Sequence, residues 1–563
     1  MSQNISTAAD FIERLEKAFA DSNRDFARAY YLFATAKLSE TYNSEEIYQR
    51  YPLLSDEQTF HQIKAAYDES TSENPGHEKL TRLFASVLGT YIGKQLAAQS
   101  DEFQNLKNQL RIDVADLGLK DLQDSSKPVE SILYEDVSQW LKSISDKSLR
   151  QKLYERMAKA YTKELSPRFI DLFQQENELL KQLGYADVIG FYSQTSGHKL
   201  KQLGERGREL VEKTQALYTE RMSAYYLERT GVEFSKATRA DIAYVMNRPS
   251  EAMAHIDARF PQERLLPLAS KTFDQLGLSF SSIAETVDYQ DTAAYDGAVV
   301  KQSDASRRRI LLDISNRKGK RSRAYVYPAQ VPSEIYLSVK PEGGLDDYSA
   351  FFHESGHALH FAYEAPSLGF ALALMGNNTV TETYAYLMQN LFLNRHWLTH
   401  EAGLTPEEAL LVVKRGALND LYMLRRYASK MQFELALYDN VNGPSYRLDD
   451  KGEVYAGLLT KGCGFVYDAE GWTRDVDAGF YVADYFTAWT LESQLRQYLM
   501  KNFGNAENHL EDWYLNPKAG EFLKGLWREG NLNQQDFAKR LGSQDPNDLK
   551  ALIELMDYNL GVS

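Results

Sequence analysis

Apolar residues recur at three- and four-residue spacing from residue 8 to about residue 285. Phe11, Leu15 and Phe19 are an early example, and the same spacing runs through residues 137–161 and 200–222. This period puts apolar side chains on one face of an α-helix, and each such face has to be buried against another element. The sequence therefore predicts a mainly α-helical protein, built from long helices that are joined by short polar breaks.

A different pattern occupies residues 297–340, where short β-branched and aromatic segments alternate with turn-forming residues. Such segments are typical of strands, so we expect a small antiparallel sheet here. Asp346 or Asp347 follows the sheet and is suited to cap a helix over 347–364. Beyond Pro366 the helical pattern returns, with a helix over 380–395 and one long irregular interval at 441–480.

The composition excludes several classes of partner and site. A net charge of −15 disfavours nucleic acid and anionic membranes as partners, and the basic run within 307–323 is short enough to be neutralised by neighbouring acids. Cys463 is the one cysteine, so neither an intrachain disulfide nor a thiolate-ligated metal is possible. The start of the chain lacks a secretory leader, and no apolar run approaches the ~18 residues of a membrane helix. We expect a cytoplasmic protein.

The segment 353–357 reads HESGH, with two histidines four residues apart. On a helix, His353 and His357 lie on one face about one turn apart, so both imidazoles can reach a single ion. Zinc accepts such nitrogen ligands at about 2.0 to 2.1 Å, and Glu354 between them can reach a water at the ion as a general base. The alternative is a structural helix that contains two hydrogen-bonded histidines.

A catalytic zinc site needs a third protein ligand. His360 is seven residues from His353, about 10.5 Å along a helix axis, which is too far for both to bind one ion. Glu364 continues the same helix and points away from the ion. Glu382, in the first turn of the next predicted helix, remains as the third ligand of a site with one Zn²⁺ per chain, although the same ligands also accept cobalt or manganese.

The segment FFHESGHALH, with Glu382 at its spacing, resembles the signature of the M3 family of zinc oligopeptidases, the group of thimet oligopeptidase and oligoendopeptidase F. The M2 group of angiotensin-converting enzyme has similar zinc spacing and is a close alternative. The resemblance implies a two-lobed helical body with a deep central channel over the zinc. We accordingly expect an N-terminal helical lobe at 1–200 and a catalytic lobe at 201–563.

The resemblance also implies a role for tyrosines in the segment 477–489. Tyr485, and with less support Tyr481, match the position of a tyrosine that hydrogen-bonds the tetrahedral intermediate, and Gly479–Tyr481 match a mobile loop. Both families carry a histidine shortly before that tyrosine, which residues 471–480 lack. Asp475, Arg474 or a histidine from elsewhere in the chain could take its place.

These observations predict a zinc metallopeptidase that hydrolyses short unstructured oligopeptides. Release of dipeptides or single residues from a C-terminus stays open, as does a catalytically silent protein that binds peptides in its groove. Arg425, Arg426 and Lys430 are possible anchors for a substrate terminus, although basic residues on helices are usually solvated. The segment 334–340 could pair with the substrate backbone. Oligomeric state is not indicated by the sequence.

Overall fold

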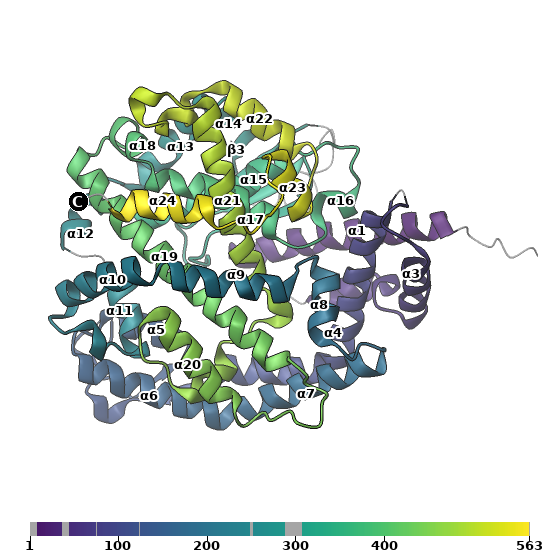
Figure 1. Cartoon of the computed structure of the whole chain (residues 1–563), viewed down its shortest axis with the longest axis horizontal. Helices are drawn as coiled ribbons and strands as arrows, with labels where there is room; N and C mark the ends of the chain where they lie inside the picture. The colour runs from purple at the N-terminus through teal and green to yellow at the C-terminus, as the bar shows by residue number, and fades with distance from the viewer. Residues whose placement is uncertain are drawn as a thin grey trace, which may run out of the picture. The chain divides into compact units, whose positions relative to one another are not determined.

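The computed structural model describes residues 8–36, 44–74, 76–122, 124–247, 251–287 and 307–561. Helices account for 70% of the chain and strands for 5%, which confirms the mainly α-helical prediction (Figure 1). Within the described ranges, no helix combines the length and apolarity needed to cross a bilayer. The predicted segments 297–306 of the sheet region lie outside the described residues.

The chain forms two compact units, each assembled from three separate stretches. The first unit comprises Met1–Tyr91, Met253–Lys414 and Thr487–Leu555, and the second comprises Ile92–Ala252, Arg415–Phe486 and Met556–Ser563. These limits differ from a single division at residue 200. The chain instead passes between the units at five points, each within a helix: α4 (His77–Gln109), α12 (Glu251–Asp257), α19 (Pro406–Tyr438), α21 (Val482–Phe503) and α24 (Lys550–Gly561).

The first unit contains the larger sheet and the helices around it. Its remaining helices are α1 (Ala8–Ala34), α2 (Ser44–Gln49), α3 (Glu57–Glu69), α13 (Leu265–Gln275), α14 (Phe280–Ile283), α15 (Leu345–Tyr363), α16 (Phe370–Leu374), α17 (Thr379–Gln389), α18 (Arg395–His400), α22 (Pro517–Trp527) and α23 (Gln534–Arg540). In α1, Phe11 and Leu15 of the predicted apolar stripe are buried, whereas Phe19 is half-buried.

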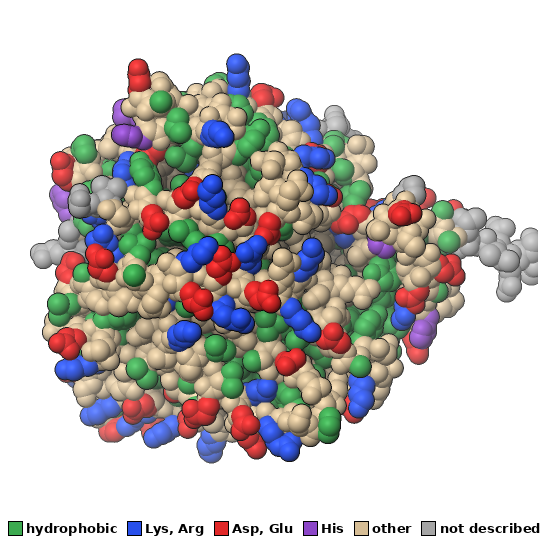
Figure 2. Space-filling view, in the orientation of Figure 1, with side chains coloured by type: hydrophobic (Ala, Val, Ile, Leu, Met, Phe, Trp, Pro, Cys, Tyr) green, Lys and Arg blue, Asp and Glu red, His purple; other side chains and the backbone are tan. Residues whose placement is uncertain are grey.

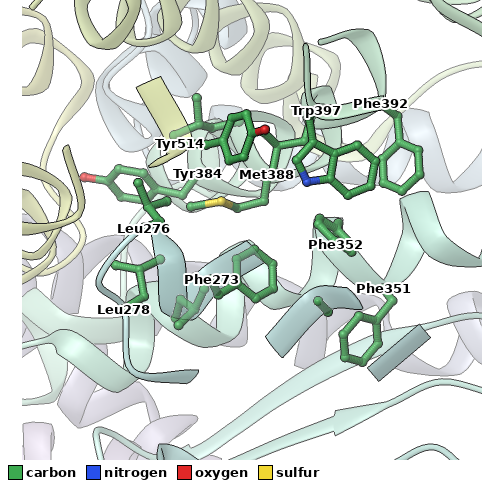
Figure 3. Close-up of a cluster of buried hydrophobic side chains, with 14 of the residues drawn as sticks. Phe273, Leu276, Leu278, Phe351, Phe352, Tyr384, Met388, Phe392, Trp397 and Tyr514 are labelled. Carbon is green, nitrogen blue, oxygen red and sulfur yellow. The ribbon is translucent and has the colours of Figure 1, made fainter. Parts of the chain in front are cut away.

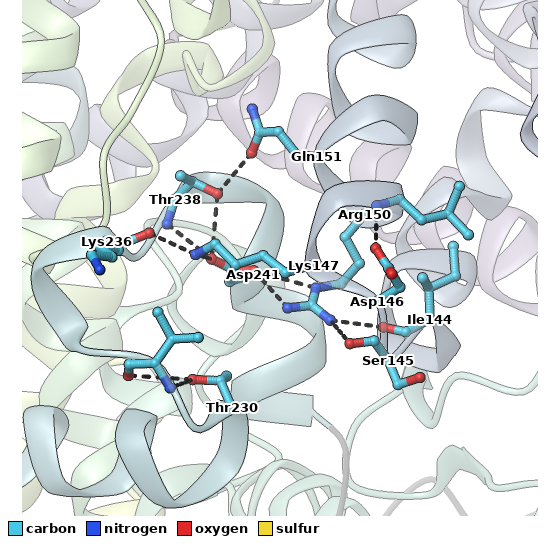
Figure 4. Close-up of polar contacts among 12 residues, drawn as sticks. Ile144, Ser145, Asp146, Lys147, Arg150, Gln151, Thr230, Lys236, Thr238 and Asp241 are labelled. Carbon is cyan, nitrogen blue, oxygen red and sulfur yellow. Dashed lines mark hydrogen bonds and ion pairs between the residues drawn. The ribbon is translucent and has the colours of Figure 1, made fainter.

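The second unit is helical apart from a two-stranded antiparallel hairpin. Its elements are β1 (Arg111–Asp113), β2 (Ser131–Leu133), α5 (Val137–Ser143), α6 (Lys147–Glu164), α7 (Ser166–Gln182), α8 (Val188–Ser196), α9 (Leu200–Lys213), α10 (Gln215–Thr230), α11 (Ile242–Asn247) and α20 (Lys451–Cys463). Asp241 is fully buried and pairs with Arg150 at 2.7 Å and Lys147 at 2.8 Å (Figure 4). Two cations around one carboxylate compensate the cost of burying the charge.

The sheet of the first unit has the order β3-β4-β6-β5, with β3 (Ala284–Thr286), β4 (Ile310–Asp313), β5 (Tyr325–Gln330) and β6 (Glu334–Ser338). The prediction of an antiparallel sheet was wrong for most of it, because β3 with β4 and β4 with β6 pair in parallel. Only β5 and β6 are antiparallel. After β4 the chain first forms the edge strand β5 and then returns to form β6 between β4 and β5. The alternation of apolar and polar residues within a strand carries no information about this order.

Part of the basic run at 307–323 is paired with nearby acids. Arg307 and Arg309 each lie 2.9 Å from Glu285, and Lys320 is buried with its Nζ 2.9 Å from Asp313. On the face shown in Figure 2, positive and negative side chains are interspersed. Ion pairing therefore accounts for four members of the run, whereas Arg321 and Arg323 are exposed.

The close contact between α15 and α17 depends on Gly356. A Cβ atom at this position would lie 2.5 Å from the carbonyl oxygen of Tyr384 and 2.6 Å from Cα of Ala385. Behind this contact lies the main core of the unit, where Phe352 packs against Phe273 and Trp397 with ring centroids 5.0 and 5.4 Å apart (Figure 3). The site helices are therefore fixed by a rigid apolar core.

Two local predictions need correction. The cap of α15 is not a side chain of its own first turn: Asp257 accepts from the backbone N–H of Leu345 at 3.0 Å, and Asp347 accepts from Gly343 in the preceding loop. The interval 441–480 is also not irregular throughout, because α20 occupies its centre. Glycines at both ends of a short helical stretch obscured it in the sequence.

Candidate metal centre

His353, His357 and Glu382 lie together between α15 and α17. Their candidate ligand atoms are all within 4.8 Å of one another. The Nε2 atoms of His353 and His357 lie 3.5 and 3.8 Å from Oε2 of Glu382. The helical register that the sequence predicted for the two histidines is present, and the carboxylate comes from the first turn of α17.

The other ring nitrogen of each histidine is held by a side chain of α17. Nδ1 of His353 lies 2.8 Å from Oε1 of Gln389, and Nδ1 of His357 lies 2.8 Å from Oγ1 of Thr381. An amide oxygen can only accept, so Nδ1 of His353 carries the proton and its Nε2 lone pair faces Glu382. The Thr381 hydroxyl can accept from His357 in the same way. Neither residue was predicted from the sequence, although Gln389 lies two helical turns after Glu382 on the same face.

The geometry and chemistry fit a divalent transition metal. Oε2 of Glu382 is buried and has no hydrogen-bond partner, which is costly for a carboxylate unless a cation binds it. Ligands at about 2.1 Å in a tetrahedral site lie about 3.4 Å apart, close to the observed separations. The side chains are 19%, 13% and 11% exposed for His353, His357 and Glu382, so the centre stays partly open to solvent.

The pKa shifts favour the ligand forms of two of these groups. Burial lowers the pKa of His357 to about 4, so its imidazole is neutral at pH 7. Burial opposes ionisation of Glu382, but the contact with His353 and the nearby charges lower the pKa of its carboxyl. For His353, burial acts to lower the pKa, and Glu382 outweighs it and raises the pKa.

Glu354 lies beside these residues on α15 and binds none of the same atoms. Burial raises the pKa of its carboxyl to about 7, with Glu382 acting in the same direction and His353, Arg323 and the backbone N–H of Val326 acting against it. A carboxyl with a pKa near neutrality can both accept and return a proton at physiological pH. Val326 belongs to β5, so Glu354 lies next to this strand within the first unit.

His360 and Glu364 do not join this centre. Both are fully buried at the C-terminal end of α15, further along the helix axis, where Nε2 of His360 donates to the carbonyl oxygen of Gly530 at 3.2 Å. Burial lowers the pKa of His360 to about 3 and raises that of Glu364 well above its usual range. Burial therefore favours the uncharged forms of both groups.

The two candidate tyrosines lie in the second unit at the start of α21. Tyr481 is 36% exposed, and its ring meets that of Tyr485 edge-on with centroids 5.0 Å apart. Tyr485 also stacks on Tyr427 at 5.4 Å. Gly479 and Phe480 before them have φ of 61° and 59°, so this turn needs left-handed backbone at two successive residues.

Neither suggested substitute for the absent histidine is free. Asp475 is paired with Arg426 and accepts from the Tyr455 hydroxyl at 2.9 Å, and Arg474 lies 3.3 Å from Asp468. A histidine from elsewhere does reach this region: buried His198 lies 2.6 Å from Asp484, the neighbour of Tyr485. No local sequence pattern links residues 198 and 484, so the sequence analysis could not identify this pair.

The possible anchors for a substrate terminus are also engaged within the second unit. Arg425 is fully buried and donates to the carbonyl oxygens of Val211 and Gly462 at 2.6 and 2.7 Å. Arg426 pairs with Asp475, and Lys430 lies 2.6 Å from Asp477. These three residues support the fold of this unit, and the expectation that they are solvated was wrong.

Comparisons with known proteins identify a family but no curated relative. A search of curated proteins gives no match. A family model described as peptidase family M3 matches residues 140–465, which is more than half of the chain and includes His353, Glu354, His357 and Glu382. The chain therefore belongs to peptidase family M3, a family of zinc metallopeptidases that act on peptides.

Proposed function

We propose that this protein is a zinc-dependent oligopeptidase that cleaves internal bonds of short, unstructured peptides. The observation that carries the proposal is the convergence of His353, His357 and the unpartnered buried oxygen of Glu382, with Glu354 adjacent to them. One Zn²⁺ would be held by these three ligands. When bound, it supplies Lewis acidity toward a carbonyl and toward water.

Glu354 is the general base and acid of the proposed reaction. Its carboxylate takes a proton from the water that attacks the scissile carbonyl carbon. The same proton passes to the leaving amine as the C–N bond breaks, so the carboxylate is regenerated. The pKa of about 7 suits both transfers, because burial, the main cause of the shift, leaves the acid and base forms similarly populated at neutral pH.

Tyr485, with Tyr481 as the alternative, would donate a hydrogen bond to the oxyanion of the tetrahedral intermediate. Loss of one such donor typically costs about 2.7 to 4 kcal/mol in the transition state. Tyr485→Phe should therefore lower kcat about a hundredfold or more with little change in KM. A kcat equal to that of the wild type would remove Tyr485 from the mechanism.

The peptide would lie along the edge of β5. The segment that the sequence suggested for this pairing, 334–340, contains β6, and β6 is hydrogen-bonded to β4 on one side and to β5 on the other. β5 is the edge strand, and Pro328 within it is typical of an edge. An extended peptide is needed for this pairing, which favours unstructured substrates. The deep channel implied by the resemblance stays a prediction.

The test combines metal content with peptide hydrolysis. Mass spectrometry should find one zinc per chain, and a mixed pool of 5- to 15-residue peptides should be cleaved at internal bonds in a chelator-sensitive way. Glu382→Gln should lose zinc and activity together. Glu364→Gln, the same change in the same unit, should retain both, because Glu364 lies outside the centre.

Three results would contradict the proposal. Zinc-free protein with full activity would exclude the metal mechanism. Trimming at C-termini alone would shift the assignment to a carboxypeptidase or peptidyl-dipeptidase. Stoichiometric zinc without turnover of any peptide would favour a silent peptide-binding protein.

A further inference from the structure

The outer edge of β5 is used unevenly along its length. Val326 contacts Glu354 through its backbone N–H, and the carbonyl oxygen of Pro328 accepts from Asn23 of α1 at 2.9 Å. The backbone N–H and C=O groups of successive residues in an antiparallel strand point to opposite edges. Those of Tyr325 and Tyr327 point toward β6, and those of Val326 and Pro328 point to the outer edge. Asn23 covers the C-terminal half of this edge, whereas the N-terminal half leads away from Glu354 toward residue 323.

Arg323 stands at that N-terminal end. It is exposed, and its guanidinium lies 5.0 Å from the centre of the Tyr325 ring. Among the described residues it forms no ion pair, unlike Arg317 of the same loop, which pairs with Asp313 at 2.5 Å. Its positive charge acts on Glu354 and Glu382, so it belongs to the electrostatic surroundings of the metal centre.

The direction of a paired peptide decides which of its ends meets Arg323. Antiparallel pairing is slightly more stable per residue than parallel pairing, and β5 already pairs this way with β6. In that direction the peptide runs opposite to β5, so the part that follows the scissile bond extends toward Arg323. Arg323 lies three positions before Val326, a distance of about 10 Å along an extended chain. This distance corresponds to two or three residues of the substrate.

We propose that Arg323 forms a subsite for a carboxylate two or three residues beyond the scissile bond. The inference rests on the proposed peptidase function and adds a substrate preference to it. A guanidinium binds a carboxylate through two parallel hydrogen bonds, and the Tyr325 ring holds the arginine in place while leaving its donors free. The carboxylate comes either from the free C-terminus of the peptide or from an aspartate or glutamate side chain.

Four quenched fluorescent peptides of one sequence test the proposal. The first peptide has a free C-terminus three residues beyond the cleaved bond, and the second has an amidated C-terminus at the same place. The third is amidated and has glutamate as the third residue beyond the cleaved bond. The fourth is amidated and has its glutamate before the cleaved bond. The wild-type protein should cleave the first or third about tenfold faster than the second in kcat/KM. Which of the two is faster identifies the source of the carboxylate. A preference for the fourth peptide alone would overturn the proposed direction.

Arg323→Gln should abolish this preference, so that the variant cleaves the first three peptides at similar rates, and Arg323→Lys should restore part of the preference. Arg321→Gln is the matched control, because Arg321 instead donates to the Tyr30 hydroxyl and should leave the preference intact. An unchanged preference in Arg323→Gln would overturn the subsite. Fluorescence anisotropy of the same peptides on Glu354→Gln reads binding without turnover, so the subsite and the peptidase function fail separately.

Discussion

Two histidines of α15, His353 and His360, each lie near a glutamate at nearly the same distance, but the two pairs differ in their chemistry. Nε2 of His353 lies 3.5 Å from Glu382, and Nε2 of His360 also lies 3.5 Å from Glu364. In the first pair the pKa of the carboxyl is lowered despite burial, and in the second burial raises it well above its usual range. We call His353 with Glu382 the outer pair and His360 with Glu364 the inner pair. The surroundings favour the ionised carboxylate in the outer pair and the protonated, neutral carboxyl in the inner pair.

The difference comes from what surrounds each pair. The outer carboxylate has a second histidine at 3.8 Å, partial exposure to solvent and the charge of Arg323, which together offset its desolvation. The inner carboxyl is 1% exposed, and neither of its oxygens has a hydrogen-bond partner. Distance between a histidine and an acid therefore does not by itself identify a metal site. The surrounding charges and the orientation of the ring nitrogens determine whether such a pair can bind a metal.

The largest effect should come from removing the base of the outer arrangement. Glu354→Gln should reduce kcat/KM by about 10²- to 10⁴-fold, the usual contribution of general acid–base catalysis, and should keep one zinc per chain because Glu354 is not a ligand. Peptide hydrolysis and metal analysis on the same preparation measure both. Glu364→Gln is the matched control and should stay within about twofold of the wild type. Equal losses in both variants would refute the distinction between the arrangements.

A smaller effect should follow when the support of a ligand is removed. Thr381→Val deletes the hydroxyl that holds Nδ1 of His357, and loss of such a contact typically weakens metal binding 10- to 100-fold. Zinc affinity can be measured by competition with a chromogenic chelator. Thr383→Val is the control, because its hydroxyl donates to the backbone of Thr379 within the same helix and should not affect the metal. Similar affinities for both variants would show that Thr381 does not orient the ligand.

The outer arrangement was largely predictable from the sequence, and the inner one was not. Helical spacing places His353 and His357 on one face, and the distance along the axis excludes His360 as a ligand of the same ion, so local geometry was sufficient. The raised pKa of Glu364 comes from its burial, which depends on packing between segments that are distant in the sequence. Gln389 and Thr381 were missed for a related reason, because their role exists only once α17 lies against α15.

The sheet shows the same limit at the level of the fold. The strand segments at 310–313, 325–330 and 334–338 could be recognised from β-branched and aromatic residues. Their order could not, since the parallel pairing of β4 with β6 places β6 between two strands that precede it in sequence. Arg323 was also not identified, because its location at the end of an edge strand follows from that order.

Gly356→Ala should push apart α15 and α17, the two helices that carry the candidate metal ligands. The new Cβ would collide with backbone atoms of Tyr384 and Ala385, which cannot rotate away, so we expect a loss of about 1 to 3 kcal/mol in unfolding free energy. Thermal and urea unfolding measure it. Gly525→Ala on α22 is the control, since a Cβ there meets no atom within 4 Å and should stabilise the helix by about 0.5 to 1 kcal/mol. If both variants gained stability, the close approach of α15 and α17 would not depend on Gly356.

The smallest effect should appear in the pH dependence of the inner arrangement. Burial lowers the pKa of His360 to about 3, so in the folded protein it stays neutral while the unfolded chain takes up a proton below about pH 6.5. Protonation of the unfolded state costs stability as the pH falls, by about 1.4 kcal/mol between pH 7.5 and 5.5 for this one group. His360→Gln cannot titrate, so the difference in unfolding free energy between wild type and variant should shrink by that amount over this range. A difference that stays constant with pH would mean that His360 titrates in the folded protein as it does in the unfolded chain, and that burial does not keep it neutral.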